Sequence, residues 1–278
     1  MNKNLTPTYQ HTALISGAAG GLGKAFAVEC ASRGWDVFLT DTADGALQTL
    51  AEGLRNSYGV KVHTHSCDLT DQASRQTLFD RLGGDGITLT ELINVAGVDH
   101  EGLFFDQTAR QIQTIIRLNV EGTLTMIHEI LPHRMKETPF HIINVCSLAG
   151  FYPMPVKATY AASKRFLLDF SLALREEVRP LGVTVTALCP AGMPTNEECR
   201  RSIESQGLAG QLTTMDVGRV ANQTINAALA GKAVVIPGEM NRWLQRLGAL
   251  VPRTILAKLI AGRWMTTRRR VVLQGGLP

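Results

Sequence analysis

A tyrosine and a lysine four residues apart, Tyr160 and Lys164, are the best candidates in this sequence for proton transfer. This spacing places two side chains on one face of a helix. An ammonium group beside a phenol lowers the phenol pKa from its ordinary value of about 10. Ser147 precedes the pair, just after the apolar run at residues 140–145. On spacing alone an ordinary amphipathic helix is the simpler interpretation, so the rest of the chain has to decide.

A glycine-rich segment near the N-terminus has the flanks of a dinucleotide-binding turn. The short apolar run at residues 13–15 precedes it, and a helical pattern extends from it to Gly34. Glycines let the backbone approach a pyrophosphate, and a helix N-terminus supplies amide donors and a favourable dipole. The sequence therefore predicts a phosphate-binding turn that contains Ser16, Gly17, Gly21, Leu22 and Gly23.

An acidic residue, Asp41, ends the next predicted strand, residues 35–41. A carboxylate in this place accepts hydrogen bonds from an adenosine ribose and repels the 2′-phosphate of NADP. No basic residue directly follows Asp41, and Gly20 in the turn is not basic, so we expect NAD to be preferred over NADP. The alternative that Asp41 only caps the next helix stays open, because a helical pattern starts at Ala43.

Strand-like and helix-like segments alternate along the chain. Further strands are predicted at residues 59–67, 92–97, 140–145, 183–189 and 233–236. Helices are predicted at residues 44–58, 71–82, 106–117, 118–135, 158–178 and 214–229, with a weak, charged helix at 196–205. This alternation predicts an α/β fold: one doubly wound parallel sheet of about seven strands, with helices on both faces and the site at the strand carboxyl ends.

With these segments placed, the chain resembles the short-chain dehydrogenase/reductase family over roughly residues 10–237. Its motifs occur in the family's order and spacing: the glycine turn from Ser16, the pair Asp68–Leu69, the segment 94–97, and Pro190 with Thr195. The family's asparagine, serine, tyrosine and lysine tetrad is matched by Asn119, Ser147, Tyr160 and Lys164.

Three positions depart from the family pattern. Ser16 stands for threonine and keeps a hydroxyl, and Val95 stands for asparagine and removes one hydrogen bond between strands. Ala191 replaces a glycine near the nicotinamide carboxamide, and we expect Gly192 to compensate.

The resemblance implies a Rossmann-type domain over residues 1–238 and an NAD(P)-dependent oxidoreductase. Tyr160 would exchange a proton with the substrate oxygen, and Lys164 would stabilise the phenolate and hold the nicotinamide ribose. Ser147 would hydrogen-bond the substrate oxygen, and Asn119 would position a water that links Lys164 to solvent. The residues implied to bind the cofactor are Ser16, Gly17, Gly21, Leu22, Gly23, Asp41, Asp68, Leu69, Asn94, Ala96, Gly97, Tyr160, Lys164, Pro190, Gly192 and Thr195. By the same analogy we expect a homodimer or homotetramer.

The segments expected to surround the substrate are mostly apolar. They are residues 98–105, 151–156 and 193–199, and they contain few cations that could hold a carboxylate or phosphate. We therefore expect a hydrophobic ketone or secondary alcohol, such as a steroid, a lipid-like chain or an aryl ketone. Within the first segment, Asp99 and His100 are expected to be solvated rather than catalytic.

The C-terminal extension, residues 239–278, gives the chain its positive net charge. The chain has a net charge of +4, yet this extension holds eight Lys or Arg and one acid. Apolar residues recur at helical spacing from Trp243 to Leu250 and again from Ile255 to Trp264. A cationic amphipathic helix of this kind lies on an anionic membrane surface, here through residues 239–270, or packs on its own domain or on a second subunit. Nucleic acid is not an expected partner, because the remaining chain is slightly acidic.

The bulk composition is that of a globular protein, with 278 residues, 45% hydrophobic and 19% charged. Five cysteines without paired spacing are interpreted as reduced thiols, and with a polar N-terminus they favour a cytoplasmic protein. No metal site is expected, since His63 and His65 lack a third ligand. The alternative to an oxidoreductase is a dinucleotide-binding redox sensor or scaffold protein that uses its basic tail to bind a membrane or a partner.

Overall fold

The structure, a computed structural model, describes residues 9–193 and 214–262. Within these residues seven strands form one parallel sheet in the order β3-β2-β1-β4-β5-β6-β7. The strands are β1 (Thr12–Ser16), β2 (Asp36–Asp41), β3 (Val62–Ser66), β4 (Glu91–Asn94), β5 (Phe140–Val145), β6 (Val183–Leu188) and β7 (Val234–Val235). The strand order reverses between β1 and β4, so the predicted doubly wound α/β fold is confirmed.

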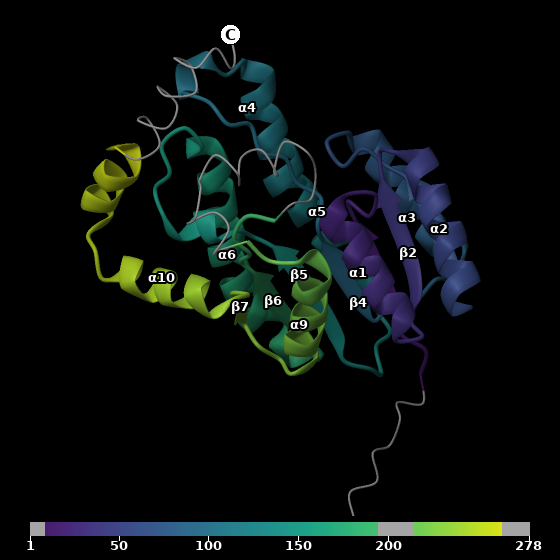
Figure 1. The fold of residues 1–278 in the computed structure, drawn as a ribbon. Helices are drawn as coiled ribbons and strands as arrows, with labels where there is room; N and C mark the ends of the chain where they lie inside the picture. The colour runs from purple at the N-terminus through teal and green to yellow at the C-terminus, as the bar shows by residue number, and fades with distance from the viewer. Residues whose placement is uncertain (1–8, 194–213, 263–278) are drawn as a thin grey trace, which may run out of the picture.

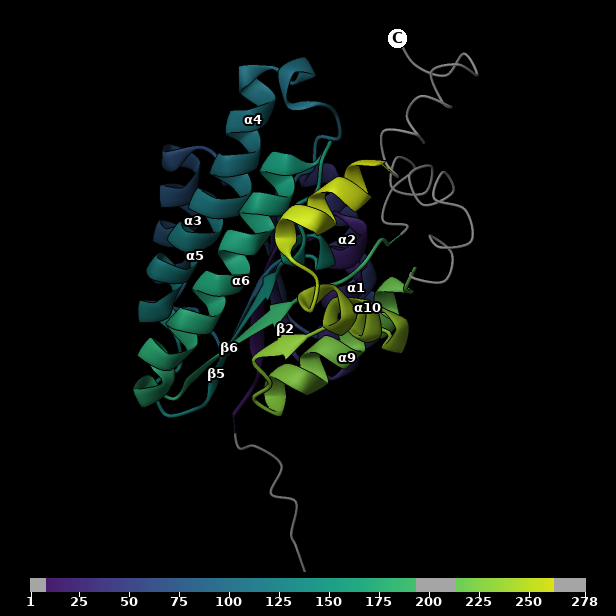
Figure 2. The same ribbon diagram turned by 90° about the vertical axis from the view of Figure 1, so that its left-hand side faces the viewer.

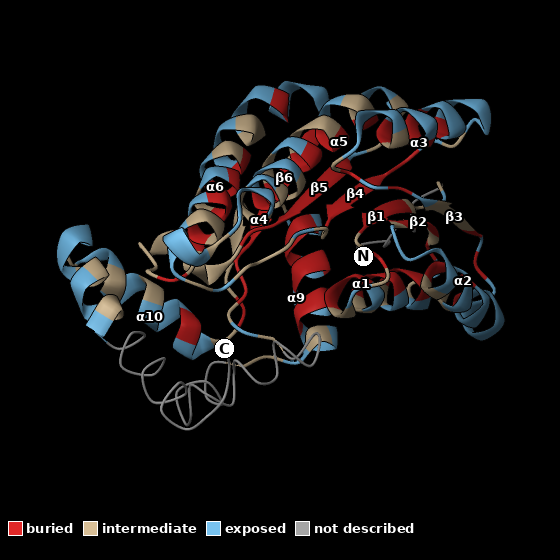
Figure 3. Cartoon of the chain, turned by 90° about the horizontal axis from the view of Figure 1, so that it is seen from above, coloured by how far each residue is buried: buried red, intermediate tan, exposed pale blue. Residues whose placement is uncertain are grey.

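Helices cover both faces of this sheet (Figure 1, Figure 2). One face carries α1 (Gly21–Ser32), α2 (Asp44–Tyr58) and α9 (Val217–Leu229). The other carries α3 (Gln72–Gly84), α4 (Ala109–Ile115), α5 (Thr123–Ile130) and α6 (Ala158–Val178). Figure 3, seen from above, shows the two helical layers with the buried sheet between them.

Alternate residues of each strand enter separate hydrophobic cores. Ile15 and Leu39 pack under α1 and α2, whereas Leu14 and Phe38 face the opposite layer. This follows from the two-residue period of a strand. The central strands β4 and β5 are buried at every position, as strands covered on both faces must be.

The helices expected at residues 106–117 and 118–135 have different bounds in the structure. After α4 the chain forms a π-helical turn, Ile116–Gly122, and then α5, which is followed by a short 3₁₀ turn at Leu131–His133. Pro132 cannot donate a helical hydrogen bond, which explains the early end. A sequence period does not reveal a π turn, and such turns are frequent at functional sites.

Two further helices follow β7, as the sequence predicted. They are α10 (Glu239–Ala249) and a helix at residues 253–262, separated at Pro252. Among the described helices, none has the length and hydropathy that a membrane span requires. The helix expected at 196–205 and the end of the tail, residues 263–278, lie outside the described residues.

Candidate active site

A cavity of about 990 Å³ opens at the carboxyl ends of the strands. Most of the predicted site residues line it: Gly17, Gly21, Leu22, Gly23, Asp41, Asp68, Leu69, Ala96, Gly97, Ser147, Tyr160, Lys164, Pro190 and Gly192. Ser16, Asn94 and Asn119 are buried behind its wall. Thr195 lies outside the described residues. The structure thus brings segments from β1 to β6 together around one space.

The glycine turn is compact because two of its positions have no room for a side chain. Gly17 has a φ of 66°, and a methyl group there would lie 2.7 Å from the Ala96 amide nitrogen. A methyl group at Gly23 would overlap the Gly17 carbonyl oxygen. Gly20, the N-cap of α1, supplies no side-chain cap. The first helical amides belong to residues that line the cavity, where they can donate hydrogen bonds to a phosphate. These features fit a dinucleotide pyrophosphate.

Asp41 combines the two interpretations that its sequence position left open. One carboxylate oxygen accepts a hydrogen bond from the Ala19 amide in the glycine turn at 3.0 Å. The other accepts one from the Ala43 amide at the start of α2 at 3.2 Å. The carboxylate also lines the cavity, where an adenosine ribose would bind.

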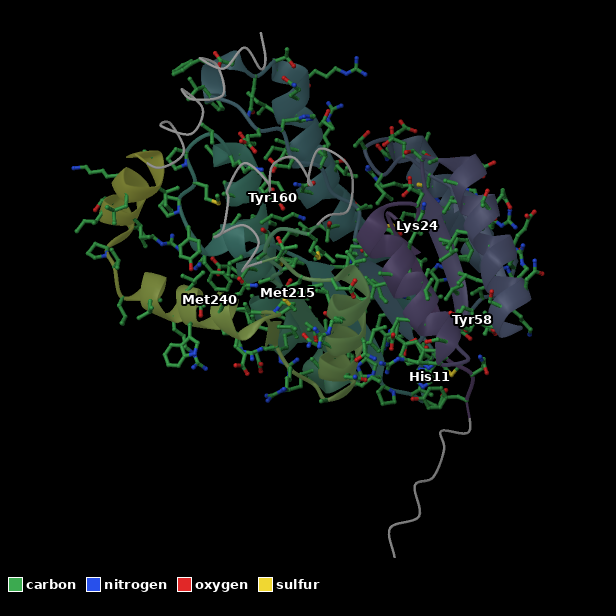
Figure 4. The ribbon with its side chains drawn as sticks, in the orientation of Figure 1. His11, Lys24, Tyr58, Tyr160, Met215 and Met240 are labelled. Carbon is green, nitrogen blue, oxygen red and sulfur yellow. The ribbon has the colours of Figure 1, made fainter. Side chains whose placement is uncertain are left out.

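Lys24 is a cavity residue that the sequence reasoning missed. It is exposed in the first turn of α1, lines the same cavity as Asp41, and is labelled in Figure 4. A cation near a 2′-phosphate was expected only after Asp41 or at position 20, and neither position holds one. The helical position of Lys24, one residue after the last glycine, was the signal that could have revealed it.

Asn119 lies in the π turn and fixes the loop that follows β4. Its Oδ1 accepts a hydrogen bond from the Val98 amide at 2.8 Å, and its Nδ2 donates to the Val98 carbonyl at 3.0 Å. Nδ2 also donates to Ser163 Oγ at 3.1 Å. The side chain therefore joins this loop to α6 on the floor of the cavity.

The Lys164 ammonium lies 5.8 Å from the centre of the Tyr160 ring, as the helical spacing predicted. It donates a hydrogen bond to the Val145 carbonyl at 2.8 Å, and burial lowers the pKa of this lysine. Gly97 leaves space for it, since a methyl group there would lie 3.1 Å from the Lys164 Nζ. The ammonium is thus held between the end of β5 and the phenol.

Ser147 follows β5 and caps a short 3₁₀ turn, Leu148–Phe151. Its Oγ accepts a hydrogen bond from the Ala149 amide at 3.1 Å. A serine hydroxyl can also donate one hydrogen bond. The bond from Ala149 does not use this donor, and Ser147 lines the cavity.

A second lysine, Lys157, lies beside the phenol and was not anticipated. Its Nζ is 6.0 Å from the centre of the Tyr160 ring and forms ion pairs with Asp99 at 2.5 Å and Glu101 at 3.1 Å. Burial alone would lower the pKa of Lys157, but the two carboxylates outweigh it and raise the pKa. Asp99, which was expected to be solvated rather than catalytic, is thus partly buried in an ion pair with a residue from a distant part of the chain.

The walls of the cavity on the substrate side are mixed. Val98, Tyr152, Met154 and Met193 supply apolar surface, as expected. Phe105, in contrast, is 95% exposed, and Phe151 packs into a core cluster. Among the described residues, this end of the cavity also carries Lys157, whose ammonium is already paired with the carboxylates of Asp99 and Glu101.

A buried hydrogen-bond chain runs beneath the cavity. Asn94 Nδ2 donates to Asn144 Oδ1 at 2.9 Å, and Asn144 Nδ2 donates to Ser171 Oγ at 2.9 Å. Asn94 is thus a positioning residue between β4, β5 and α6. Four cysteines are buried as free thiols, whereas Cys199 lies outside the described residues, and the described part of the chain holds no cluster of three metal-ligating side chains.

Comparison with known proteins gives consistent results. A family model for short chain dehydrogenases matches residues 11–204. The chain is 35% identical over 180 residues to a very-long-chain 3-oxoacyl-CoA reductase of Laccaria bicolor, a match that covers 63% of this chain and 53% of that protein. The chain therefore spans about half the length of that relative.

Solved structures share the fold over most of the chain. A short-chain dehydrogenase from Sphingobium yanoikuyae in complex with NADPH is 32% identical, with a TM-score of 0.75 over 86% of this chain and 93% of that one. A bulky-bulky ketone specific alcohol dehydrogenase from Comamonas testosteroni is 27% identical, with a TM-score of 0.73 over 88% and 96%. A short-chain dehydrogenase/reductase from Burkholderia phymatum in complex with NAD is 26% identical, with a TM-score of 0.75 over 87% and 94%.

Proposed function

The chain belongs to the short-chain dehydrogenase family, and from this premise we propose that it interconverts a hydrophobic ketone and its secondary alcohol with a nicotinamide cofactor. The observation that carries the proposal is the Tyr160 and Lys164 pair, which lines the same cavity as the glycine turn. A proton-transfer group and a dinucleotide cradle facing one space are what hydride transfer to a carbonyl requires.

Each of the three polar side chains has a distinct task in this reaction. A bound nicotinamide cofactor would supply the hydride for ketone reduction and would accept it in alcohol oxidation. Tyr160 gives its proton to the carbonyl oxygen during reduction, and its phenolate accepts the alcohol proton during oxidation. Lys164, fixed by the Val145 carbonyl, stabilises the phenolate. Ser147 donates a hydrogen bond to the substrate oxygen and orients it toward Tyr160.

We propose NAD as the preferred cofactor, with a narrow margin over NADP. Asp41 favours a free ribose 2′-hydroxyl, but Lys24 places a cation in the same cavity that can pair with a 2′-phosphate. Related structures were solved with either NADPH or NAD, which agrees with the two opposing charges.

We propose a neutral, hydrophobic group next to the reacting carbonyl. Val98, Tyr152 and Met193 provide apolar surface, and Lys157 is already paired with two carboxylates, so it is not free to bind an anionic substrate group. Related proteins named for a very-long-chain 3-oxoacyl-CoA and for a bulky ketone lend support to this class.

The test is a substrate screen with the purified full chain, following the absorbance of NADH or NADPH with aryl ketones, steroid ketones and medium-chain 3-oxoesters. We expect turnover of at least one, and Tyr160→Phe should reduce kcat by about 10²–10⁴-fold, the usual contribution of a general acid. NADH binding, measured by fluorescence, should be retained in this variant. An unchanged kcat in Tyr160→Phe would refute the assignment, as would absence of turnover across the panel.

A further inference from the structure

Helix α10 contacts the body of the protein through its polar and small residues. Among its residues Asn241 is the buried one, and its Nδ2 donates a hydrogen bond to the Pro237 carbonyl at 2.9 Å. Gly248 packs against Tyr152, because a methyl group there would lie 2.5 Å from the ring. Figure 3 shows α10 at the edge of the molecule, with pale blue, exposed positions along it.

The apolar residues of this region point outward instead. Trp243 is 59% exposed and Leu247 57% exposed, and Leu250 reaches 82%. The helix at residues 253–262 continues the pattern. We define the outer face as the exposed apolar side chains of both helices: Met240, Trp243, Leu244, Leu247, Leu250, Ile255 and Leu259.

This orientation rejects one alternative that the sequence left open. An amphipathic helix packed on its own domain hides its apolar stripe and exposes its polar side. Here Met240, Trp243, Leu244 and Leu247 share one side of α10 and all are exposed, while Asn241 faces the body. The described residues of the domain therefore leave the outer face largely uncovered, as a docking surface would be.

The segment that carries the outer face has a positive net charge. Residues 239–262 contain Arg242, Arg246, Arg253 and Lys258 against one acid, Glu239. The Arg246 guanidinium lies 5.9 Å from the centre of the Trp243 ring, so charge and apolar surface are directly adjacent. Exposed tryptophan with neighbouring basic residues is the composition of helices that lie in a lipid headgroup region.

We propose that the outer face docks on the surface of an anionic lipid bilayer. A second copy of the chain fits less well, because a symmetric contact would bring together two segments of the same positive net charge. Anionic headgroups satisfy these cations, while acyl chains accept Trp243 and Leu247.

The docked surface lies next to the substrate side of the cavity. Tyr152, which packs on Gly248, lines the active-site cavity and also a second cavity of about 460 Å³, shared with Arg253 and Ala257. Insofar as the proposed function holds, a hydrophobic substrate would pass from the bilayer to Tyr160 along this wall.

Vesicle sedimentation of the full chain tests the docking. Vesicles of phosphatidylcholine and phosphatidylglycerol in equal amounts should bind the protein at least about tenfold more tightly than phosphatidylcholine alone, and added salt should weaken the binding. The double variant Arg246→Gln/Lys258→Gln should lose about tenfold in affinity for the anionic vesicles, because each cation near the surface contributes severalfold.

The double variant Leu247→Ser/Leu250→Ser should lose tenfold or more on the same vesicles, because both side chains leave the acyl region. Leu181→Ser is the matched control, since Leu181 is 52% exposed but lies in a different part of the fold, and it should bind as the unaltered chain does. Absence of vesicle binding, or unchanged binding by the Leu247→Ser/Leu250→Ser variant, would overturn the proposal. A lipid-free dimer that this variant abolishes would overturn it as well, in favour of a second copy.

Vesicle binding is measured without cofactor or substrate, so the outcome is separate from that of the proposed function. Retained turnover of a water-soluble ketone together with absent vesicle binding would reject only the docking. Vesicle binding without turnover of any ketone would reject only the oxidoreductase.

Discussion

The buried ammonium of Lys164 joins the end of β5 to the phenol of Tyr160: it donates to the Val145 carbonyl at 2.8 Å and lies 5.8 Å from the tyrosine ring centre. Because the ammonium is anchored on the backbone, its position relative to the phenol does not depend on a flexible surface side chain. The cation is also already desolvated, so its field at the phenol is stronger than in water.

We expect Lys164→Met to move the pH dependence of alcohol oxidation to higher pH. Without the ammonium the phenolate is less stable, so the pH of half-maximal kcat/KM should rise by a unit or more, since an opposite charge within a few ångströms shifts a pKa by roughly 1–3 units. Lys232→Met, in an exposed loop, is the control. A lower rate with an unchanged pH profile would contradict the electrostatic role.

Neutralising Lys157 and neutralising its partner Asp99 should shift the pH profile of alcohol oxidation in opposite directions. At 6.0 Å a unit charge contributes about 0.7 kcal/mol in a water-like dielectric, or about half a pKa unit. Lys157→Gln should therefore raise the pH of half-maximal oxidation, and Asp99→Asn should lower it. If both variants lose rate without opposite pH shifts, the ion pair only holds the loop in place.

Cofactor preference should respond to one acid and one base at the adenosine end of the cavity. Asp41→Ser removes the repulsion of a 2′-phosphate, so kcat/KM with NADPH relative to NADH should rise about tenfold or more, an effect of roughly 1.4 kcal/mol. Lys24→Gln should lower use of NADPH and leave use of NADH unchanged. Lys61→Gln, an exposed lysine outside the cavity, should change neither ratio, and a fall in both cofactors with Lys24→Gln would show a structural effect instead.

His141 in β5 should make the fold less stable as the pH falls. Burial, with the nearby charge of His11, lowers the pKa of His141 from 6.5 to about 4. Below about pH 6.5 His141 therefore binds a proton in the unfolded chain, whereas in the folded chain it stays neutral until about pH 4. The contribution to the free energy of unfolding that is present above pH 6.5 is lost as the pH falls. Between pH 6.5 and 5 this amounts to about 2 kcal/mol.

Urea unfolding at these two pH values, comparing His141→Gln with the unaltered chain, isolates the contribution. The glutamine can keep a hydrogen bond to Thr184 Oγ1, now 2.8 Å from the histidine ring nitrogen, and should lose about 2 kcal/mol less stability across the interval. The exposed His128, changed to Gln, serves as the control. An equal pH dependence in the His141 variant would refute the prediction.

Local pattern and spacing were enough to predict the strands, the glycine turn and the placement of Tyr160 beside Lys164, because each depends on residues close together in sequence. The Lys157 ion pair could not be predicted in this way, since Asp99 and Lys157 meet only when two loops fold over one cavity. The π turn that holds Asn119 could not be predicted either, because its amino-acid composition is also compatible with an α-helix. The sequence could not predict which face of α10 is exposed, because an amphipathic pattern does not say which face packs on the domain.

The chain from Asn94 through Asn144 to Ser171 has a consequence for how this protein could diversify. It joins β4 and β5 to α6, the helix that carries the tyrosine proposed as the acid–base group, through buried hydrogen bonds. The proposed proton-transfer residues therefore rest on one connected framework, whereas Tyr152 and Met154 of the segment at residues 151–156 line the cavity without taking part in that chain. Exchange of that segment between homologous proteins should alter which ketones are accepted and leave the proton-transfer geometry intact, so new specificities can arise without reassembly of the catalyst.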